Sequence, residues 1–215
     1  MHNVVILNSS QIEQASKILT KAFYKDPMFR YLGIETEQKR SRVNADALKW
    51  FCDLSLRNCQ PYNQVYVTQD DDDIKGVAAW IPPGKPEMTI WQFFRMSLAL
   101  PWKCGWHRLG RCLSLFYTLD RRHQQEMTKP HWVLSLIAVA PGCQGQGIGS
   151  LLLQPVLEQA DKEGTSCYLS TFTEQAVGFY KKHGFEVLWR GKFSEGSPDI
   201  WTMKRKPKSL LNIPR

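Results

Sequence analysis

The sequence lacks several features by which whole classes of protein are recognised. None of its 6 cysteines forms a Cys-x-x-Cys pair, and only 5 histidines are present, so the ligand spacing of a structural zinc site is missing. No run of about 18 apolar residues occurs, so no membrane-spanning helix is expected. The N-terminus carries no basic stretch followed by an apolar run, so no secretory signal is expected either. Together these absences predict a cytoplasmic protein with free thiols and no metal.

The charge balance is basic. The formal net charge is +8, while the hydrophobic share of 43% and the charged share of 22% are typical of a folded domain. The positive electrostatic potential of a protein with this net charge favours anionic partners: nucleic acid, a membrane surface or a polyanionic cofactor. Part of the excess lies near the C-terminus, where residues 206–215 are predicted to form a basic, solvated tail. No recognition helix or aromatic–basic platform is present, so nucleic acid is not the expected partner.

Residue patterns predict a mixed sheet with helices on both faces. The first helix is expected to start at Ser9 or Ser10, and Asp70 to Asp73 suit an exposed hairpin tip. Because strands and helices alternate before a final antiparallel pair, we expect an α/β fold (α+β mixed sheet) in a single domain, residues 1–205. Strand patterns cover residues 4–7, 65–67, 74–81, 132–139, 167–172, 184–189 and 200–203, and helical patterns cover 12–23, 36–56, 148–162 and 174–183.

An aromatic segment at residues 89–118 differs from the rest of the chain. It is rich in Trp, Phe and Leu and carries Arg95, Lys103, Arg108 and Arg111 between them. We expect two or three short helices, broken at Pro101 and Gly105, within a helical insertion near residues 87–128. Three interpretations stay open: a cluster packed on the core, a lid over an apolar substrate pocket, or a membrane-surface patch.

A glycine-rich loop at residues 141–150 follows the apolar strand pattern at 132–139. Glycines at 145, 147 and 149 let the backbone approach a ligand closely, and N–H groups at the start of the next helix suit a phosphate. A P-loop needs a lysine after its last glycine, but Gly149 is followed by Ser150. A dinucleotide fingerprint needs a third glycine where Ser150 stands. The loop therefore predicts a phosphate ligand that is neither ATP nor NAD.

Three ordered blocks resemble one family. Gln144-x-x-Gly147-x-Gly149 resembles the Q/R-x-x-G-x-G/A signature of the GNAT superfamily of acyl-CoA-dependent N-acyltransferases. The strand Leu-Ser-Leu-Ile-Ala-Val-Ala-Pro at 134–141 and the block Phe-Tyr-Lys-Lys-His-Gly-Phe at 179–185 resemble its flanking segments. The resemblance covers residues 132–193 well. More loosely, residues 22–27 and 76–84 resemble the subgroup that includes puromycin N-acetyltransferase.

The resemblance implies a GNAT fold, with a central mixed, mostly antiparallel sheet, and acetyl-CoA as co-substrate without a metal. A backbone N–H near Ala138 or Val139 would polarise the thioester carbonyl. Tyr180 would be the catalytic general acid that protonates the departing thiolate. The residues that the resemblance assigns to the cofactor are Ile137, Ala138, Val139, Gln144, Gly145, Gln146, Gly147, Ile148, Gly149 and Ser150.

The general base is left open by the sequence. The strand position that carries a glutamate in many family members is Val133 here, which takes no proton. His131 and Ser135 are expected to share its face, because side chains alternate along a strand. Asp26, near the acceptor loop by resemblance, could orient or deprotonate the amine, and a water chain is equally open. Asp26, His131 and Ser135 are therefore the candidate substrate contacts.

The resulting functional expectation is an N-acetyltransferase that acts on the primary amine of a small molecule. The amine would attack the thioester of acetyl-CoA directly in a ternary complex. The alternative is a noncatalytic acyl-CoA-binding sensor or scaffold, which the missing strand glutamate favours. The protein is expected to be a monomer or homodimer, without integral membrane association.

Overall fold

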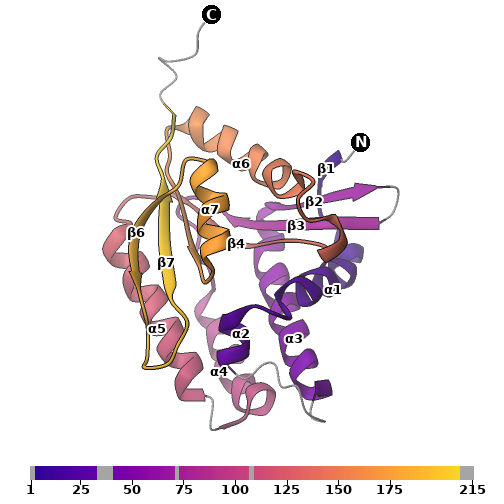
Figure 1. Ribbon diagram of the computed structural model, residues 1–215, viewed down its shortest axis with the longest axis vertical. Coiled ribbons are helices and arrows are strands. Elements are labelled where there is room, and N and C mark those ends of the chain that lie inside the picture. The colour runs from indigo at the N-terminus through magenta and orange to yellow at the C-terminus, as the bar shows by residue number, and fades with distance from the viewer. Residues whose placement is uncertain (1–2, 33–40, 71–72, 107–108, 209–215) are drawn as a thin grey trace, which may run out of the picture.

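The computed structural model describes residues 3–32, 41–70, 73–106 and 109–208. They form one seven-stranded sheet in the order β1-β2-β3-β4-β5-β7-β6, with helices on both faces (Figure 1). The β4–β5 pair is parallel and the five other pairs are antiparallel, which confirms the mixed, mostly antiparallel sheet. The strands are β1 (Asn3–Ile6), β2 (Val65–Asp70), β3 (Asp73–Ile81), β4 (Trp132–Val139), β5 (Cys167–Thr171), β6 (Glu186–Gly191) and β7 (Ile200–Arg205).

Two buried clusters lie on opposite faces of the sheet. One is built with α1 (Ile12–Phe23), α2 (Pro27–Tyr31), α3 (Ser41–Cys59), α4 (Ile90–Cys104) and α5 (Leu109–Glu126). The other is built with α6 (Ile148–Glu163) and α7 (Glu174–Lys182). Short 3₁₀ turns, η1 (Ser9–Gln11), η2 (Gln60–Tyr62) and η4 (Pro141–Cys143), join these elements. The expected helical insertion corresponds to α4 and α5.

One predicted helix start was wrong. Asn8, rather than Ser9 or Ser10, caps the first helical segment: its side chain accepts the Ser10 N–H at 3.1 Å, while Gln11 accepts the Asn8 N–H. This reciprocal capping box starts a 3₁₀ turn that leads into α1. A second helix, α2, starts just after α1, because Asp26 caps it and proline suits its first position.

The aromatic segment breaks once between its two helices. Gly105, with φ of 87°, ends α4 as predicted. The predicted break at Pro101 was wrong, because this residue lies in the last turn of α4, where its ring is buried. Of the predicted helix at 36–56, residues 36–40 lie outside the described residues, as do Asp71 and Asp72 of the hairpin tip.

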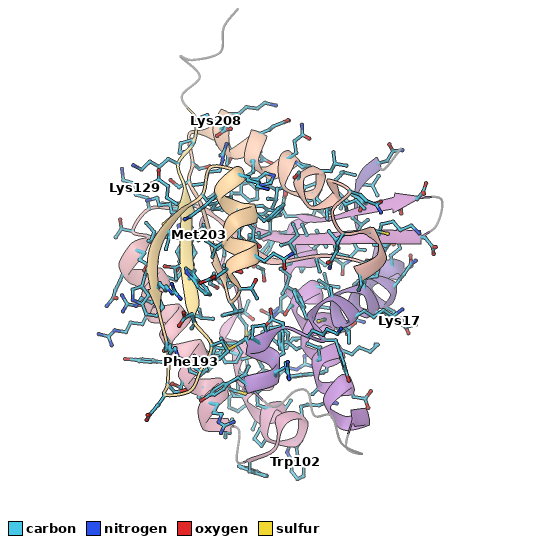
Figure 2. All side chains as sticks on the ribbon, viewed as in Figure 1. Lys17, Trp102, Lys129, Phe193, Met203 and Lys208 are labelled. Carbon is cyan, nitrogen blue, oxygen red and sulfur yellow. The ribbon has the colours of Figure 1, made fainter. Side chains whose placement is uncertain are left out.

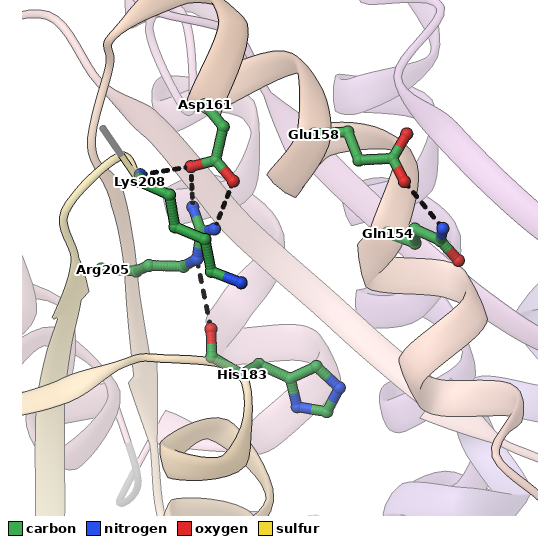
Figure 3. A network of polar contacts seen from close by, with 6 residues as sticks. All are labelled: Gln154, Glu158, Asp161, His183, Arg205 and Lys208. Carbon is green, nitrogen blue, oxygen red and sulfur yellow. Dashed lines mark hydrogen bonds and ion pairs between the residues drawn. The ribbon is translucent and has the colours of Figure 1, made fainter. Parts of the chain in front are cut away.

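A buried ion pair joins the C-terminal end of strand β7 to the helices α6 and α7 (Figure 3). Arg205, 3% exposed, donates to both carboxylate oxygens of Asp161 at 2.8 and 2.6 Å and to the His183 carbonyl at 3.2 Å. Burial alone would raise the pKa of Asp161, but hydrogen bonds from Arg205 and the Lys208 amide lower it overall. Removing one partner of such a pair costs about 3–5 kcal/mol. The pair therefore holds α6, the end of α7 and β7 together.

The cysteines of the described residues are free thiols, as predicted for Cys52, Cys59, Cys112, Cys143 and Cys167. Burial raises the pKa of Cys52, Cys59 and Cys167 to about 12. In the described part of the chain, no group of three or more His, Cys, Asp or Glu side chains is arranged to hold a metal ion. No described helix has both the length and the apolar character needed to cross a membrane.

Candidate active site

The central parallel strands separate after a short contact. β4 pairs with β5 only at Trp132–Leu134 opposite Cys167–Leu169. Beyond Leu134 the described residues of the two strands are no longer paired, although β4 runs on to Val139 and β5 to Thr171. The middle of the sheet therefore contains a gap bordered by unpaired backbone. Such an edge can bind an extended ligand as an added strand.

A β-bulge at Ser135 coincides with the start of the gap. Ala79 of β3 faces Leu136 while the next residue, Trp80, faces Leu134, so Ser135 is an extra residue on β4. Because of this extra residue, odd-numbered side chains of β4 lie on one face of the sheet before the bulge and on the opposite face after it. Val133, Leu136 and Ala138 consequently pack in the cluster of α1–α5, whereas Leu134, Ile137 and Val139 pack in the cluster of α6 and α7.

The bulge also decides which amides face the gap. The Ala140 N–H donates to the Lys75 carbonyl of β3 at 2.8 Å. Hydrogen-bonded residues alternate along an antiparallel ladder, so the Ala138 N–H also points toward β3. The N–H groups of Ile137 and Val139 therefore point toward the gap. Of the two amides that the sequence left open, Val139 has the one on the gap side, where it could stabilise a developing oxyanion.

The glycine loop forms the start of α6. Gly145 and Gly147 have φ of 79° and 80°, in the left-handed region that favours glycine. A Cβ at either position would meet nothing within 4 Å, so the backbone angle is what requires glycine there. Gly147 caps a 16-residue helix without any side-chain hydrogen bond to its N–H groups. A helix start that no side chain caps leaves N–H groups at the positive end of the helix, and such groups are suited to bind a pyrophosphate.

The third glycine has a different role. A Cβ on Gly149 would lie 3.1 Å from Cζ of Phe179, so this glycine lets α6 pack closely on α7. Next to it, the Ser150 hydroxyl lies 3.0 Å from Nε2 of His183, whose Nδ1 is 2.9 Å from the Phe179 carbonyl. A carbonyl only accepts, so Nδ1 of His183 carries a proton, and its Nε2 forms the hydrogen bond with the Ser150 hydroxyl. The loop and the helix of Tyr180 are thus directly connected.

Tyr180 lies on the inner face of α7. Its ring packs between Phe179, at 5.2 Å between centroids, and Phe185, at 5.7 Å. Only 6% of the residue is exposed, and burial raises the pKa of its phenol. A phenol with a raised pKa stays protonated at neutral pH and can donate its proton to a leaving group.

One large cavity lies on the α1–α5 face and reaches the gap. Its volume is about 1380 Å³, and its wall includes Ile137, Thr171 and Tyr180. Many wall residues are aromatic or aliphatic, among them Phe29, Trp50, Phe51, Phe93, Met96 and Phe116. Asp26, His131 and Ser135 all line it, so the three candidate substrate contacts border the same cavity as Tyr180. The described residues of loop 144–150 are not part of this wall and border the gap at the far end of β4.

The polar part of the wall contains a network that the sequence did not reveal. His123 Nδ1 lies 2.9 Å from the Glu87 carboxylate, and its Nε2 faces Nε2 of His131. His131 Nδ1 lies 2.7 Å from the Lys129 carbonyl, and the His123 ring stacks on Tyr168. Because a carbonyl only accepts, neutral His131 donates through Nδ1 and accepts from His123 through Nε2. Both ring nitrogens of His131 therefore form hydrogen bonds within the protein. This favours a structural role in the cavity wall over a role as the general base.

The other two candidates differ from His131. Asp26 accepts the Met28 N–H at 2.8 Å, and burial raises the pKa of its carboxyl, against opposing hydrogen bonds from Met28 and Phe29. A half-buried carboxylate in a largely apolar cavity is suited to bind or deprotonate an ammonium group. Ser135 lies on the bulge, with its hydroxyl next to the thiol of Cys59. Of the three, Asp26 is the residue whose side chain can carry the negative charge that binds an ammonium group.

Comparisons with known proteins agree with this geometry. The Acetyltransferase (GNAT) family matches residues 23–185, more than half of the chain. A Dictyostelium discoideum protein named "Probable serine/threonine-protein kinase" is 24% identical over 95% of this chain but only 31% of its own length. The chain thus spans less than a third of that relative.

Two solved structures share the fold. A histone acetyltransferase HPA2 and related acetyltransferase of Corynebacterium glutamicum has a TM-score of 0.63 at 20% identity, covering 99% of both chains. A Drosophila melanogaster polyamine N-acetyltransferase that forms N-acetylagmatine has a TM-score of 0.66 at 13% identity, covering 96% of this chain and 100% of the other. With the split sheet, the glycine loop and a family match over most of its length, the chain belongs to the acetyltransferase (GNAT) family.

Proposed function

We propose that this protein transfers the acetyl group of acetyl-CoA to the primary amine of a small molecule by direct attack in a ternary complex. The observation that carries the proposal is that one cavity meets the β4–β5 gap beside Ile137 and Tyr180. An acceptor in the cavity and a cofactor along the gap would then meet at Tyr180. Holding the two reactants together in this way supplies much of the rate in a reaction of this kind.

The cofactor end uses backbone more than side chains. The amides of residues 144–150 are suited to hold the pyrophosphate, and Ile137 and Val139, with Ala138 between them, provide the unpaired strand edge. Acetyl-CoA, when bound, supplies the acyl thioester. The Cys59 thiol lines the cavity, but its pKa of about 12 keeps it protonated, so the acceptor amine itself is the nucleophile.

The acceptor end combines an apolar wall with a half-buried carboxylate. Asp26 would attract an ammonium group and take up its proton, while aromatic residues such as Phe29 and Phe51 would hold an apolar body. Glu87 adds a second carboxylate to a wall that also contains Lys85 and Lys129, so the ammonium group would be attracted mainly by Asp26. This mixture favours an amine attached to an apolar group. The polyamine acceptor of the Drosophila structure would match only the carboxylates.

Thiol release from acetyl-CoA, measured with a panel of amines at mildly alkaline pH, tests the proposal. We expect saturable turnover with phenethylamine and weaker turnover with putrescine, because only the first fills the apolar wall. Tight acetyl-CoA binding without turnover on any amine would instead favour the noncatalytic acyl-CoA-binding sensor or scaffold. That alternative has one supporting observation: the Val133 position on β4 is buried and carries no carboxylate.

Asp26→Asn isolates the charge of the proposed acceptor contact. Asparagine caps a helix about as well as aspartate, so α2 should be preserved. We expect kcat/KM for the amine to fall by about 100-fold or more, because a positioned base contributes at least that much. In the wild type, activity should decline as the pH falls through the raised pKa of Asp26. That acidic limb should be absent from the variant.

The raised pKa of Asp26 also predicts how Asp26→Asn changes the stability of the protein. A carboxyl with a raised folded-state pKa contributes stability below its unfolded pKa and loses it as the pH rises through the folded pKa. At neutral pH the variant should therefore melt no lower than the wild type. Asp120→Asn, at an exposed carboxylate on the same wall, is the matched control and should keep kcat/KM within about twofold. An equal loss in both variants would remove the role assigned to Asp26.

A further inference from the structure

The outer face of α4 carries large apolar side chains in contact with solvent. Trp91, Phe94, Leu98 and Trp102 follow each other at intervals of three or four residues, so they form one stripe along the helix. Trp91 is 74% exposed and Trp102 is 80% exposed. The stripe is about 16 Å long, at 1.5 Å of rise per residue. Soluble proteins rarely leave such a patch open without a partner.

The opposite face of the same helix is already used. Met96 and Leu100 are buried and, with Phe93, line the large cavity. The helix therefore separates the cavity from the outer stripe, and packing on the core does not explain the stripe. Figure 1 shows α4 at one end of the molecule, and Figure 2 shows the side chain of Trp102 projecting outward there, far from Lys208. An end that projects in this way can meet a flat surface.

The charges around the stripe identify the kind of surface. No acidic residue occurs between Glu87 and Asp120, while four of the residues in between are Arg or Lys. Arg95 lies within the stripe and is exposed, and Lys103 follows Trp102 directly. Neither forms an ion pair with any residue in the described ranges. Tryptophan with Lys or Arg on one helix face is typical of a helix that lies in the interface of an anionic bilayer.

We propose that α4 docks this protein onto an anionic membrane surface, with Trp91, Phe94, Leu98 and Trp102 inserted among the lipids. Arg95 and Lys103 then face the phosphate groups. The docking is peripheral, since no described helix can cross the bilayer. It places the cavity one helix diameter, about 10 Å, from the lipid. The inference does not depend on the acetyl-transfer reaction.

Sedimentation with vesicles tests the proposal on the whole 215-residue chain. We expect the wild type to pellet with phosphatidylcholine vesicles that contain about one third phosphatidylglycerol, and much less with phosphatidylcholine alone. The double variant Trp91→Ser/Trp102→Ser should bind the anionic vesicles at least about 100-fold more weakly, since burying each of the two rings contributes more than a tenfold factor. Arg95→Gln should weaken binding about fivefold and reduce its dependence on salt.

Matched controls distinguish binding through this surface from nonspecific hydrophobic or electrostatic adsorption to vesicles. Leu188→Ser removes an exposed apolar residue on β6, and Lys17→Gln removes a positive charge on α1; both should bind as the wild type does. Thermal melting checks that each variant is folded, and gel filtration follows its oligomeric state. Absence of wild-type binding to anionic vesicles would overturn the proposal. So would a wild-type dimer that the tryptophan variant converts to a monomer, because the stripe would then cover a second copy.

Discussion

Replacing Gly147 with glutamate will weaken acetyl-CoA binding by about 100-fold, measured by titration calorimetry. A carboxylate placed about 5 Å from the pyrophosphate in a partly exposed site repels it by about 3 kcal/mol. The substitution does not clash, because a Cβ at this position meets nothing within 4 Å. Its left-handed φ of 80° should in addition lower the free energy of unfolding by about 1 kcal/mol.

Two control variants separate charge from backbone strain. Gly147→Gln carries the same strain without the charge, so it should retain most of the affinity. Gly196→Glu introduces the same charge at another left-handed glycine, with φ of 73° and open space around it, outside the loop. It should leave binding unchanged. If Gly147→Gln weakens binding as much as Gly147→Glu does, repulsion is not the cause, and unchanged affinity in Gly147→Glu would remove the loop from the cofactor site.

Tyr180→Phe will lower kcat by about 100-fold while leaving the Kd of acetyl-CoA within about twofold. The ring keeps its packing against Phe179 and Phe185, so only the proton donor is removed. Burial raises the pKa of the phenol, so in the wild type the acid stays protonated as the pH rises through the neutral range. The loss should therefore have the same size from neutral to mildly alkaline pH.

Steady-state kinetics and a binding titration on the same protein distinguish the possible roles of Tyr180. Tyr168→Phe is a matched control, because this tyrosine also lines the cavity but donates its hydroxyl to Glu126 at 3.2 Å. It should reduce kcat only slightly. A parallel loss of kcat and affinity in Tyr180→Phe would assign Tyr180 a structural role, and unchanged kcat would require another proton donor.

The sequence predicted the elements around the proposed cofactor site, namely the strand β4 and the helices α6 and α7, because local rules decide them. Left-handed glycines at the start of a helix and an aromatic helix that follows at fixed spacing can be recognised from neighbouring residues. Gly149 was expected to serve the backbone conformation, whereas its role is contact with Phe179 across two helices. Such a contact depends on tertiary packing and leaves no local pattern.

The acceptor end of the site was less predictable, because it too depends on tertiary packing. The bulge at Ser135 depends on how β4 pairs with β3, and no glycine or proline marks it. It determines that Val139 rather than Ala138 directs its amide to the gap. The pairing of His123 with His131 depends on how α5 packs beside β4, across a loop that carries no motif. Propensity alone also placed a break at Pro101, which the last turn of α4 accommodates.

The Asp161–Arg205 pair has a consequence for how the protein loses its structure. It links the last turn of α6 to β7 and to the carbonyl of His183, so the two helices that carry the glycine loop and Tyr180 form one cooperative unit. The stability that the lowered pKa of Asp161 provides at neutral pH is lost as the pH falls through that pKa. Local opening of this unit would expose both halves of the site to solvent at once, so acid should inactivate them together.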